Sequence, residues 1–349
     1  MIGTQPWPET GIDGFTRGFA TIDGTRIHYV TGGRPDGEVI VLFPGFPQTW
    51  YAWRKILPIL GGTYRIVAPD LPGQGDSDRP LSGFDTASVA KLVLSLMDRL
   101  GVQQHYLAAH DVGAWVSYPY VSMFGDRVKA LAILDTGIPG ISLPDNLPWA
   151  AHVAWRTWHV AFHNLPDLPE ALIEGREDYY LRWFLQRKAA NPQIFVQADF
   201  DEYARTFKLN GLKGGLGYYR AVTQSAEQNR NLAAKAKLEM PVLAVRADQG
   251  SMPDLVAQLK VIATDVPEPQ LPTVVITLPK NNPKPWQGNW GPSSIRWTRL
   301  VASSGRQHQF NDTQPSRLIR NSGDRHGRNT AIPHRNSRSL PRHADDSTL

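Results

Sequence analysis

The chain of 349 residues contains no cysteine, and this absence excludes several kinds of chemistry. Disulfides, thiolate metal sites and cysteine nucleophiles are all ruled out. Residues Met1 to Phe15 lack a basic segment followed by an apolar run, so we expect no signal peptide. No stretch stays apolar over the length that a bilayer requires. We therefore expect a cytoplasmic protein with no membrane partner.

The net charge of +5 arises at one end of the chain. Residues 280–349 hold 12 lysines and arginines against 4 acidic residues, whereas the remainder holds 25 against 28. A basic segment can bind nucleic acid. This one is crowded with Arg, Asn, Ser and Pro and is poor in apolar residues, so it cannot bury enough surface to offset chain entropy. We expect it to be disordered, and we expect no nucleic-acid partner for the reason given below.

Short apolar runs bounded by Gly, Pro or Asp predict the strands of a mostly parallel sheet with helices on both faces. These runs are Val39–Phe43, Arg65–Ala68, Gln104–Ala109, Ala130–Leu134 and Pro241–Val245. Between them, Thr86–Leu100 has helical periodicity and stops at Gly101. Near the start, Phe19–Val30 predicts a hairpin that turns at Asp23-Gly24. Alternation of strands and helices indicates the α/β class.

Residues 140–232 differ from the rest of the chain. They are rich in aromatic and charged residues at helical spacing, and they contain no clear strand pattern. We interpret them as a helical cap inserted between two strands of the sheet. The predicted domains are thus a first core part at 1–139, the cap at 140–232, an incomplete second core part at 233–266, and an aberrant tail at 267–349.

The motif Ala109-His110-Asp111-Val112-Gly113 follows a predicted strand and precedes a predicted helix. Small residues around a sharp strand-to-helix turn are typical of a nucleophile elbow, which lifts one side chain clear of the backbone. Here that side chain is Asp111, and a carboxylate can attack carbon to form a covalent ester. The alternative interpretation is an ordinary aspartate that caps a helix.

Two further motifs bear on this choice. The strand ending at Phe43 runs into Pro44–Trp50, a tight turn that can aim the Phe46 N–H at an oxyanion alongside the Val112 N–H. The next strand ends in the turn-rich loop Asp70–Ser77, which we interpret as structural.

The order and spacing of the three motifs resemble the α/β-hydrolase superfamily over about residues 15–266. They are most similar to epoxide hydrolases and the related haloalkane and fluoroacetate dehalogenases. The resemblance implies an aspartate nucleophile, a small apolar electrophile as substrate, and neither a cofactor nor a metal ion. Pro44 and Ala109 depart from the family, which usually has His and Gly at these positions.

The choice within the family depends on the residues after the nucleophile. Fluoroacetate dehalogenases have arginines where this chain has Val112 and Trp115, and haloalkane dehalogenases usually have Trp at the Val112 position. The segment Gly214–Arg220 is similar to the epoxide-hydrolase cap motif, which places Tyr219 as the donor of a proton to the epoxide oxygen. The resemblance therefore favours epoxide hydrolysis over dehalogenation.

Other pocket residues follow from the same resemblance. Tyr180, or its neighbour Tyr179, is the candidate for a second proton donor, and Trp115 and His159 are candidate wall residues of the substrate pocket. Each of these tyrosines can also be a half-buried structural residue with a satisfied hydroxyl. A non-catalytic remnant that binds small apolar ligands stays as an alternative, and the sequence does not indicate an oligomeric state.

A triad of this family also needs an acid and a histidine. Asp135 and Asp248 each follow a predicted strand, and we favour Asp135 as the acid. The family places its base in a pattern like Gly-His-Tyr followed by Glu-Glu-Gln-Pro-Glu after the last strand, and this pattern is missing. The late histidines all stand among polar, helix-breaking residues: His308, His326, His334 and His343.

A shifted reading frame would account for the missing base. Codons for Pro279–Asn289, read from each third base, permit Glu-Glu-Gln-Pro-Glu, and those for Val275–Thr277 permit His-Tyr. Asn281 followed by Asn282 permits only Gln or a stop in that frame. We therefore hypothesise a frameshift near residues 266–267, beyond which the basic charge carries no function.

Sequencing the DNA across codons 255–290 tests this hypothesis. We expect the shifted frame to encode His-Tyr before Glu-Glu-Gln-Pro-Glu. If no reading frame encodes a histidine there, the frameshift hypothesis is wrong.

Overall fold

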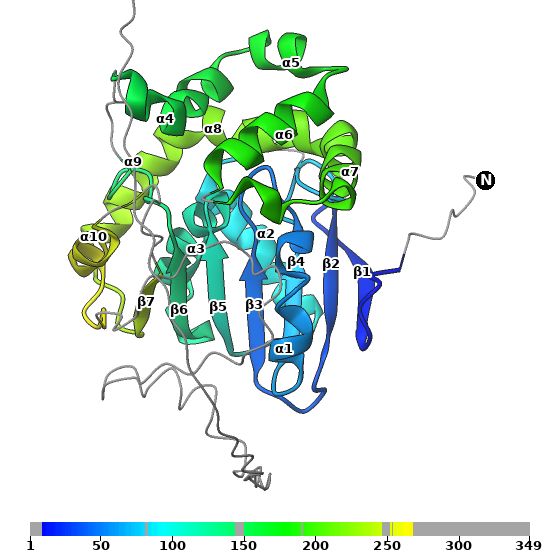
Figure 1. Ribbon diagram of the computed structural model, residues 1–349. Helices are drawn as coiled ribbons and strands as arrows, with labels where there is room; N and C mark the ends of the chain where they lie inside the picture. The colour runs from blue at the N-terminus through cyan, green and yellow to red at the C-terminus, as the bar shows by residue number, and fades with distance from the viewer. Residues whose placement is uncertain are drawn as a thin grey trace, which may run out of the picture. The chain divides into compact units, whose positions relative to one another are not determined.

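The computed structural model describes residues 9–80, 83–143, 150–189, 191–245, 252 and 254–267 (Figure 1). The strands are β1 (Phe15–Ile22), β2 (Thr25–Gly33), β3 (Val39–Phe43), β4 (Arg65–Pro69), β5 (His105–His110), β6 (Val128–Leu134) and β7 (Val242–Val245). The helices are α1 (Leu57–Gly61), α2 (Thr86–Arg99), α3 (Val112–Met123), α4 (Ala151–Asn164), α5 (Leu168–Ile173), α6 (Glu177–Lys188), α7 (Gln197–Thr206), α8 (Leu212–Arg220), α9 (Val222–Ala233) and α10 (Leu255–Ile262).

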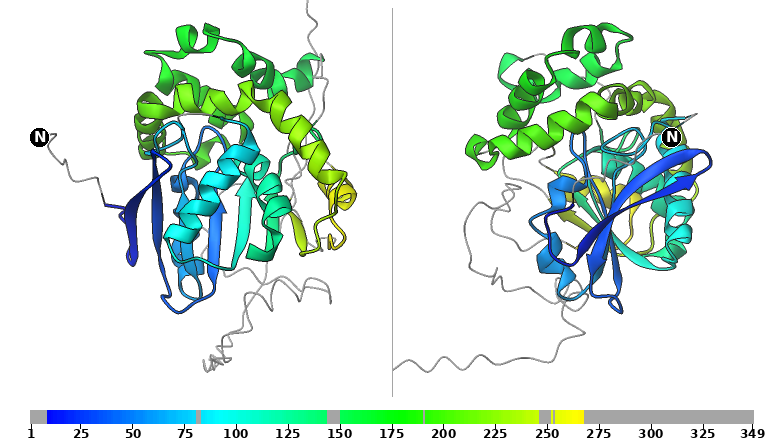
Figure 2. Two further views of the ribbon diagram at one scale, coloured as in Figure 1. Left: turned by 180° about the vertical axis from the view of Figure 1, so that it is seen from behind. Right: turned by 90° about the vertical axis from the view of Figure 1, so that its right-hand side faces the viewer.

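One mixed sheet organises the fold. The seven strands follow the order β1-β2-β4-β3-β5-β6-β7. The pairs β1–β2 and β2–β4 are antiparallel, and all pairs from β4 to β7 are parallel. Helix α1 lies on one face of the sheet, and α2 and α3 cover the other (Figures 1 and 2). The predicted α/β class, with helices on both faces of a mostly parallel sheet, is confirmed.

Alternation along the central strands divides their side chains between two cores. Val41 and Phe43 of β3 face the larger core with α2 and α3, whereas Ile40 and Leu42 face a smaller core that includes Leu57 of α1. Because both faces are covered, these strands are apolar at successive positions, which is the pattern that predicted them.

The amino-terminal hairpin turns where the sequence predicts. Ile22 and Thr25 are paired across the turn, and Asp23 and Gly24 have φ values of 46° and 77°. Positive φ at both central residues is typical of the two-residue turn that fits the twist of paired strands, and Asp-Gly adopts it readily. Strand β1 begins at Phe15, four residues before the predicted start of the hairpin.

Helices α4 to α9 are inserted between β6 and β7 in the chain, and α4 to α8 lie over one end of the sheet (Figures 1 and 2). They occupy the stretch where the sequence predicts a cap, and we call them the inserted helices. The domain boundaries stay a prediction, and the tail beyond Pro267 lies outside the described residues. No helix in the part of the chain that the structure describes has the length and apolar character needed to cross a bilayer.

His105, the first residue of β5, makes a pH-dependent contribution to stability. The side chain is fully buried, and its Nε2 lies 3.3 Å from the Tyr120 hydroxyl. Desolvation, with a smaller contribution from the charge of Arg127, lowers the pKa of His105 to about 4. The imidazole therefore stays neutral in the folded protein at pH values where it is protonated in the unfolded chain.

The free energy of unfolding should therefore fall as the pH falls from about 6.5 towards 4. Between pH 7.5 and 5, His105 should contribute about 2 kcal/mol of this loss. Urea unfolding of the wild type and His105→Phe at both pH values measures it, and we expect a smaller pH dependence in the variant. Equal pH dependence of the two proteins would contradict the assignment.

Candidate active site

Asp111 occupies the sharp turn between β5 and α3. Its backbone has φ 51° and ψ −124°, a conformation that is costly for a residue with a side chain. Two glycines let the loop after β3 approach it. A Cβ atom on Gly113 would lie 2.5 Å from the Pro44 carbonyl oxygen, and one on Gly45 would lie 2.5 Å from the Cβ atom of Asp111. The turn is thus held in place by backbone that touches it on both sides.

The carboxylate of Asp111 meets a backbone donor. The Phe46 N–H donates a hydrogen bond to Asp111 Oδ1, with 3.0 Å between nitrogen and oxygen. Val112 is the first residue of α3, so its N–H has no carbonyl acceptor within the helix. The structure therefore brings together the two residues that the sequence predicts as oxyanion donors.

Tyr219 of α8 packs against Phe46, the residue whose N–H binds this carboxylate. Its ring centroid is 5.3 Å from that of Phe46 and 5.3 Å from that of Trp115, and its side chain is buried. Burial raises the pKa of Tyr219 well above its ordinary value, and the nearby Asp111 and Tyr180 raise it further. The phenol is therefore neutral at physiological pH and has a proton to donate.

The histidines of α4 complete this pocket wall. His159, predicted from the sequence, has its ring centroid 5.8 Å from that of Tyr219. His163, which sequence reasoning missed, is closer at 4.5 Å, and its Nε2 hydrogen-bonds the Tyr180 hydroxyl. Burial, followed by the charges of Lys188 and Arg220, lowers the pKa of His163 to about 3.

Burial also lowers the pKa of His159 well below its ordinary value, with smaller contributions from Lys188 and His163. Both histidines are therefore neutral. The four-residue spacing of His159 and His163 places both on one helix face, and this spacing is the sequence signal that could have identified His163. Of the two adjacent tyrosines, Tyr180 is buried, whereas Tyr179 is 73% exposed and does not enter the pocket.

Lys188, at the end of α6, is a second residue that sequence reasoning missed. Its Nζ lies 3.3 Å from His159 Nε2 and 4.5 Å from the ring centroid of Phe184. Desolvation lowers the pKa of Lys188 to about 8, although the charges of Asp111 and Asp135 act in the opposite direction. The residue as a whole is exposed to solvent, although its ammonium group contacts the buried His159.

Asp135 lies at the same end of the sheet as Asp111. It follows β6 with φ 43°, and its N–H donates to the Val245 carbonyl at 2.8 Å. Asp248, the alternative acid, and the four late histidines lie outside the described residues. The buried histidines have other partners: His28 contacts Asp70, His105 contacts Tyr120, His159 contacts Lys188, and His163 contacts Tyr180.

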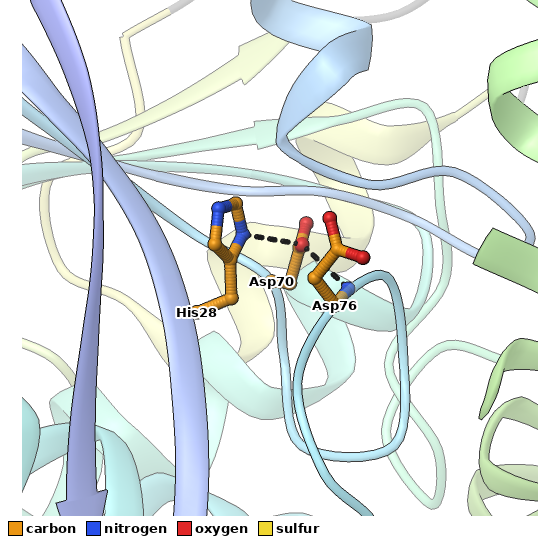
Figure 3. A group of neighbouring side chains, drawn as sticks. All are labelled: His28, Asp70 and Asp76. Carbon is orange, nitrogen blue, oxygen red and sulfur yellow. Dashed lines mark hydrogen bonds and ion pairs between the residues drawn. The ribbon is translucent and has the colours of Figure 1, made fainter. Parts of the chain in front are cut away.

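A separate buried cluster joins His28, Asp70 and Asp76 (Figure 3). His28 Nδ1 lies 2.7 Å from Asp70 Oδ2, which also accepts the Asp76 N–H at 3.0 Å. Arg205 bonds both oxygens of Asp76 at 2.8 Å, and Arg17 bonds one at 2.9 Å. Burial raises the pKa of Asp76, but the hydrogen bonds and charge of Arg205, with the charges of His28 and Arg17, lower it overall. Two guanidinium groups already neutralise this carboxylate, which disfavours a metal cation there.

The loop Asp70–Ser77 instead connects the sheet to the inserted helices. Arg205 belongs to α7, so its ion pair with Asp76 joins the two parts of the fold. A Cβ atom on Gly214 of α8 would lie 2.0 Å from the Gly73 carbonyl oxygen, and the Tyr218 hydroxyl donates to the Pro72 carbonyl at 2.8 Å. These contacts agree with the structural interpretation of this loop.

A carboxylate on a strand-turn-helix elbow, with a backbone donor beside it and inserted helices above it, defines a site of the α/β-hydrolase type. Comparisons with known proteins agree with this class. The profile of the alpha/beta hydrolase fold family matches residues 38–271. The chain belongs to this family.

Several of the relatives within this family are epoxide hydrolases. The chain is 39% identical over 231 residues to the soluble epoxide hydrolase of Corynebacterium sp. (strain C12), covering 64% of this chain and 78% of that protein. Among solved structures it is similar to Cfl2 from Burkholderia cenocepacia, with 58% identity, a TM-score of 0.71, and coverage of 72% of this chain and 86% of the other. The unliganded epoxide hydrolase CorEH gives 34% identity, a TM-score of 0.65, and coverage of 72% and 89%. The predicted resemblance to epoxide hydrolases is thus confirmed.

The elbow geometry predicts a specific sensitivity at Gly113. Gly113→Ala should lower the free energy of unfolding by about 1–3 kcal/mol, because the new methyl group meets backbone carbonyl oxygens that cannot move independently. Gly62→Ala is the matched control, since its Cβ atom would have no neighbour closer than 3.6 Å. Chemical unfolding measures both variants, and equal stability would show that the β3 loop does not constrain the elbow.

Proposed function

We propose that the chain is an epoxide hydrolase in which Asp111 attacks an epoxide carbon and forms an alkyl-enzyme ester. The observation that carries this proposal is the hydrogen bond from the Phe46 N–H to Asp111, with the phenol of Tyr219 packed against the Phe46 ring. One carboxylate oxygen is held by the backbone, and the other is available as the nucleophile. A proton donor stands on the side of the inserted helices.

In the first step, Asp111 Oδ2 forms a bond to the epoxide carbon as the carbon–oxygen bond of the ring breaks. The electron pair of that bond goes to the epoxide oxygen, which takes the proton of the Tyr219 hydroxyl. The high pKa of Tyr219 keeps this proton in place until the oxygen becomes basic. Asp111 Oδ1 becomes the carbonyl oxygen of the ester and keeps its hydrogen bond from Phe46.

The neighbouring side chains orient this donor. His163 packs against the Tyr219 ring and engages the Tyr180 hydroxyl, so Tyr180 acts first as the anchor of His163. Trp115 and His159 also pack against the Tyr219 ring. We keep Tyr180 as the candidate second donor, because rotation of its hydroxyl away from His163 would free its proton.

The second step needs water to attack Cγ of the ester. The oxyanion that forms is Oδ1, and we propose that the N–H groups of Phe46 and Val112 stabilise it; the hydrogen bond from Phe46 and the helix-start position of Val112 support this assignment. A base must activate the water, and Asp135 is the candidate acid that orients this base. We propose that the frameshift removed the histidine base, so turnover should be lower than in an intact relative by at least about 10²–10⁴-fold.

Halide displacement is a second candidate function. It is favoured by the buried Trp115 Nε1, which has no hydrogen-bond partner among the residues described and lies beside Tyr219. An indole N–H of this kind suits a halide leaving group, and Asp111 would be the nucleophile in the same way. Halide release from haloalkanes separates this function from epoxide opening.

A protein that performs neither reaction would be a ligand-binding remnant of the fold. The cytoplasmic location stays a prediction.

Mass spectrometry of the protein after exposure to styrene oxide tests the first step. We expect a covalent adduct on Asp111 that persists, because water is not activated to remove it. Asp111→Asn should form no adduct, and Tyr219→Phe should form it about 10²-fold or more slowly, since it lacks the donated proton. An unmodified Asp111 in folded protein would overturn the nucleophile assignment.

A further inference from the structure

The positively charged side chain of Lys188 has no role in the proposed reaction. Lys188 is the last residue of α6, and its ammonium group lies at His159 Nε2 and over the Phe184 ring. No aspartate or glutamate among the described residues forms an ion pair with Lys188. The contacts that the structure gives this ammonium group are a neutral imidazole and an aromatic ring, and neither of them carries a negative charge.

The surroundings of Lys188 offer little compensation for its charge. His159 and His163 are both neutral, and each has its pKa lowered further by the charge of Lys188. The carboxylates that stabilise the ammonium do so at longer range, and they are Asp111 and Asp135. Lysines at helix carboxyl termini are favoured by the helix dipole. That preference does not require the side chain to lie over Phe184 and against His159.

The position of Lys188 relative to the nucleophile Asp111 indicates what its charge can do. Lys188 contacts His159, and His159 packs against Tyr219. Tyr219 in turn packs against Phe46, whose N–H binds Asp111. His159 and Tyr219 therefore connect Lys188 with the surroundings of the nucleophilic carboxylate, whose charge also acts on the ammonium group. A substrate that carries a negative charge would be repelled by Asp111 alone, and a cation at Lys188 offsets this repulsion.

We propose that Lys188 binds a carboxylate group of the substrate, so that the preferred substrate is an epoxide bearing a carboxylate and not a wholly apolar one. This inference rests on the proposed function of the same site. It refines the expectation of an apolar substrate, because the aromatic side chains contact the carbon skeleton while Lys188 selects the charged end. Lys188 is thus a specificity-determining residue and takes no part in bond making.

Two probes that share one skeleton test the proposal. The neutral probe is styrene oxide, and the anionic probe is 4-(oxiran-2-yl)benzoate. The measurement is the rate constant for covalent labelling of Asp111 by each, followed by mass spectrometry at pH 7, where Lys188 is charged. We expect the wild type to be labelled at least tenfold faster by the anionic probe than by the neutral one.

Variants at Lys188 should change this ratio. Lys188→Met should lower the ratio of anionic to neutral labelling at least tenfold, and Lys188→Arg should restore part of it. Lys213→Met is the matched control, because Lys213 is an exposed lysine of α8, and the ratio should not change. A wild type without preference for the anionic probe, or a Lys188→Met variant with the wild-type ratio, would overturn the proposal.

A binding measurement separates this proposal from the proposed function. In Asp111→Asn, quenching of tryptophan fluorescence reports the binding of 4-ethylbenzoate and of its neutral amide, neither of which can alkylate the protein. We expect Lys188→Met in this background to weaken benzoate binding at least tenfold relative to amide binding. If neither epoxide labels the wild type but this binding preference is found, the proposed reaction is wrong and the carboxylate site stands. If benzoate and amide bind alike, the carboxylate site is wrong.

Discussion

The close approach of the β3 loop to the turn at Asp111 is the constraint on which the rest of the site depends. Asp111 holds a costly backbone conformation, and Gly45 and Gly113 are the positions where backbone from the two segments comes too near for a side chain. The same approach brings the Phe46 N–H to the carboxylate. Strain at one residue and the position of its hydrogen-bond donor therefore have a single structural cause.

Burial then determines the protonation states around this carboxylate. It keeps the phenol of Tyr219 protonated and the imidazoles of His159 and His163 neutral, so the pocket wall can donate protons without adding positive charge. Lys188 is the exception, since the carboxylates Asp111 and Asp135 act against its desolvation. The electrostatic character of the pocket is therefore that of a carboxylate and an ammonium separated by neutral aromatic groups.

Sequence reasoning predicted the parts of this arrangement that depend on local pattern. Strand patterns, the Asp23-Gly24 turn and the elbow each follow from neighbouring residues, so they were found. The contacts of His163 and Lys188 depend instead on how α4, α6 and α8 pack together. Apart from the four-residue spacing of His159 and His163, the neighbouring sequence does not identify their partners. A lysine in the last turn of a helix, in particular, has an ordinary explanation in the helix dipole. Structure was needed to show that its ammonium group faces His159.

The loop Asp70–Ser77 explains how a donor on the inserted helices is held in register with a nucleophile on the sheet. Tyr219 follows Tyr218, whose hydroxyl is bonded to the Pro72 carbonyl, and Gly214 touches Gly73 one turn earlier on α8. The ion pair of Asp76 with Arg205 adds a charged contact to α7. Asp70 fixes the conformation of this loop through its hydrogen bonds with His28 and the Asp76 N–H. The cluster therefore affects the active site by fixing the position of the loop backbone that contacts α8. Its carboxylates are thus accounted for by a mechanical role that requires no bound ion.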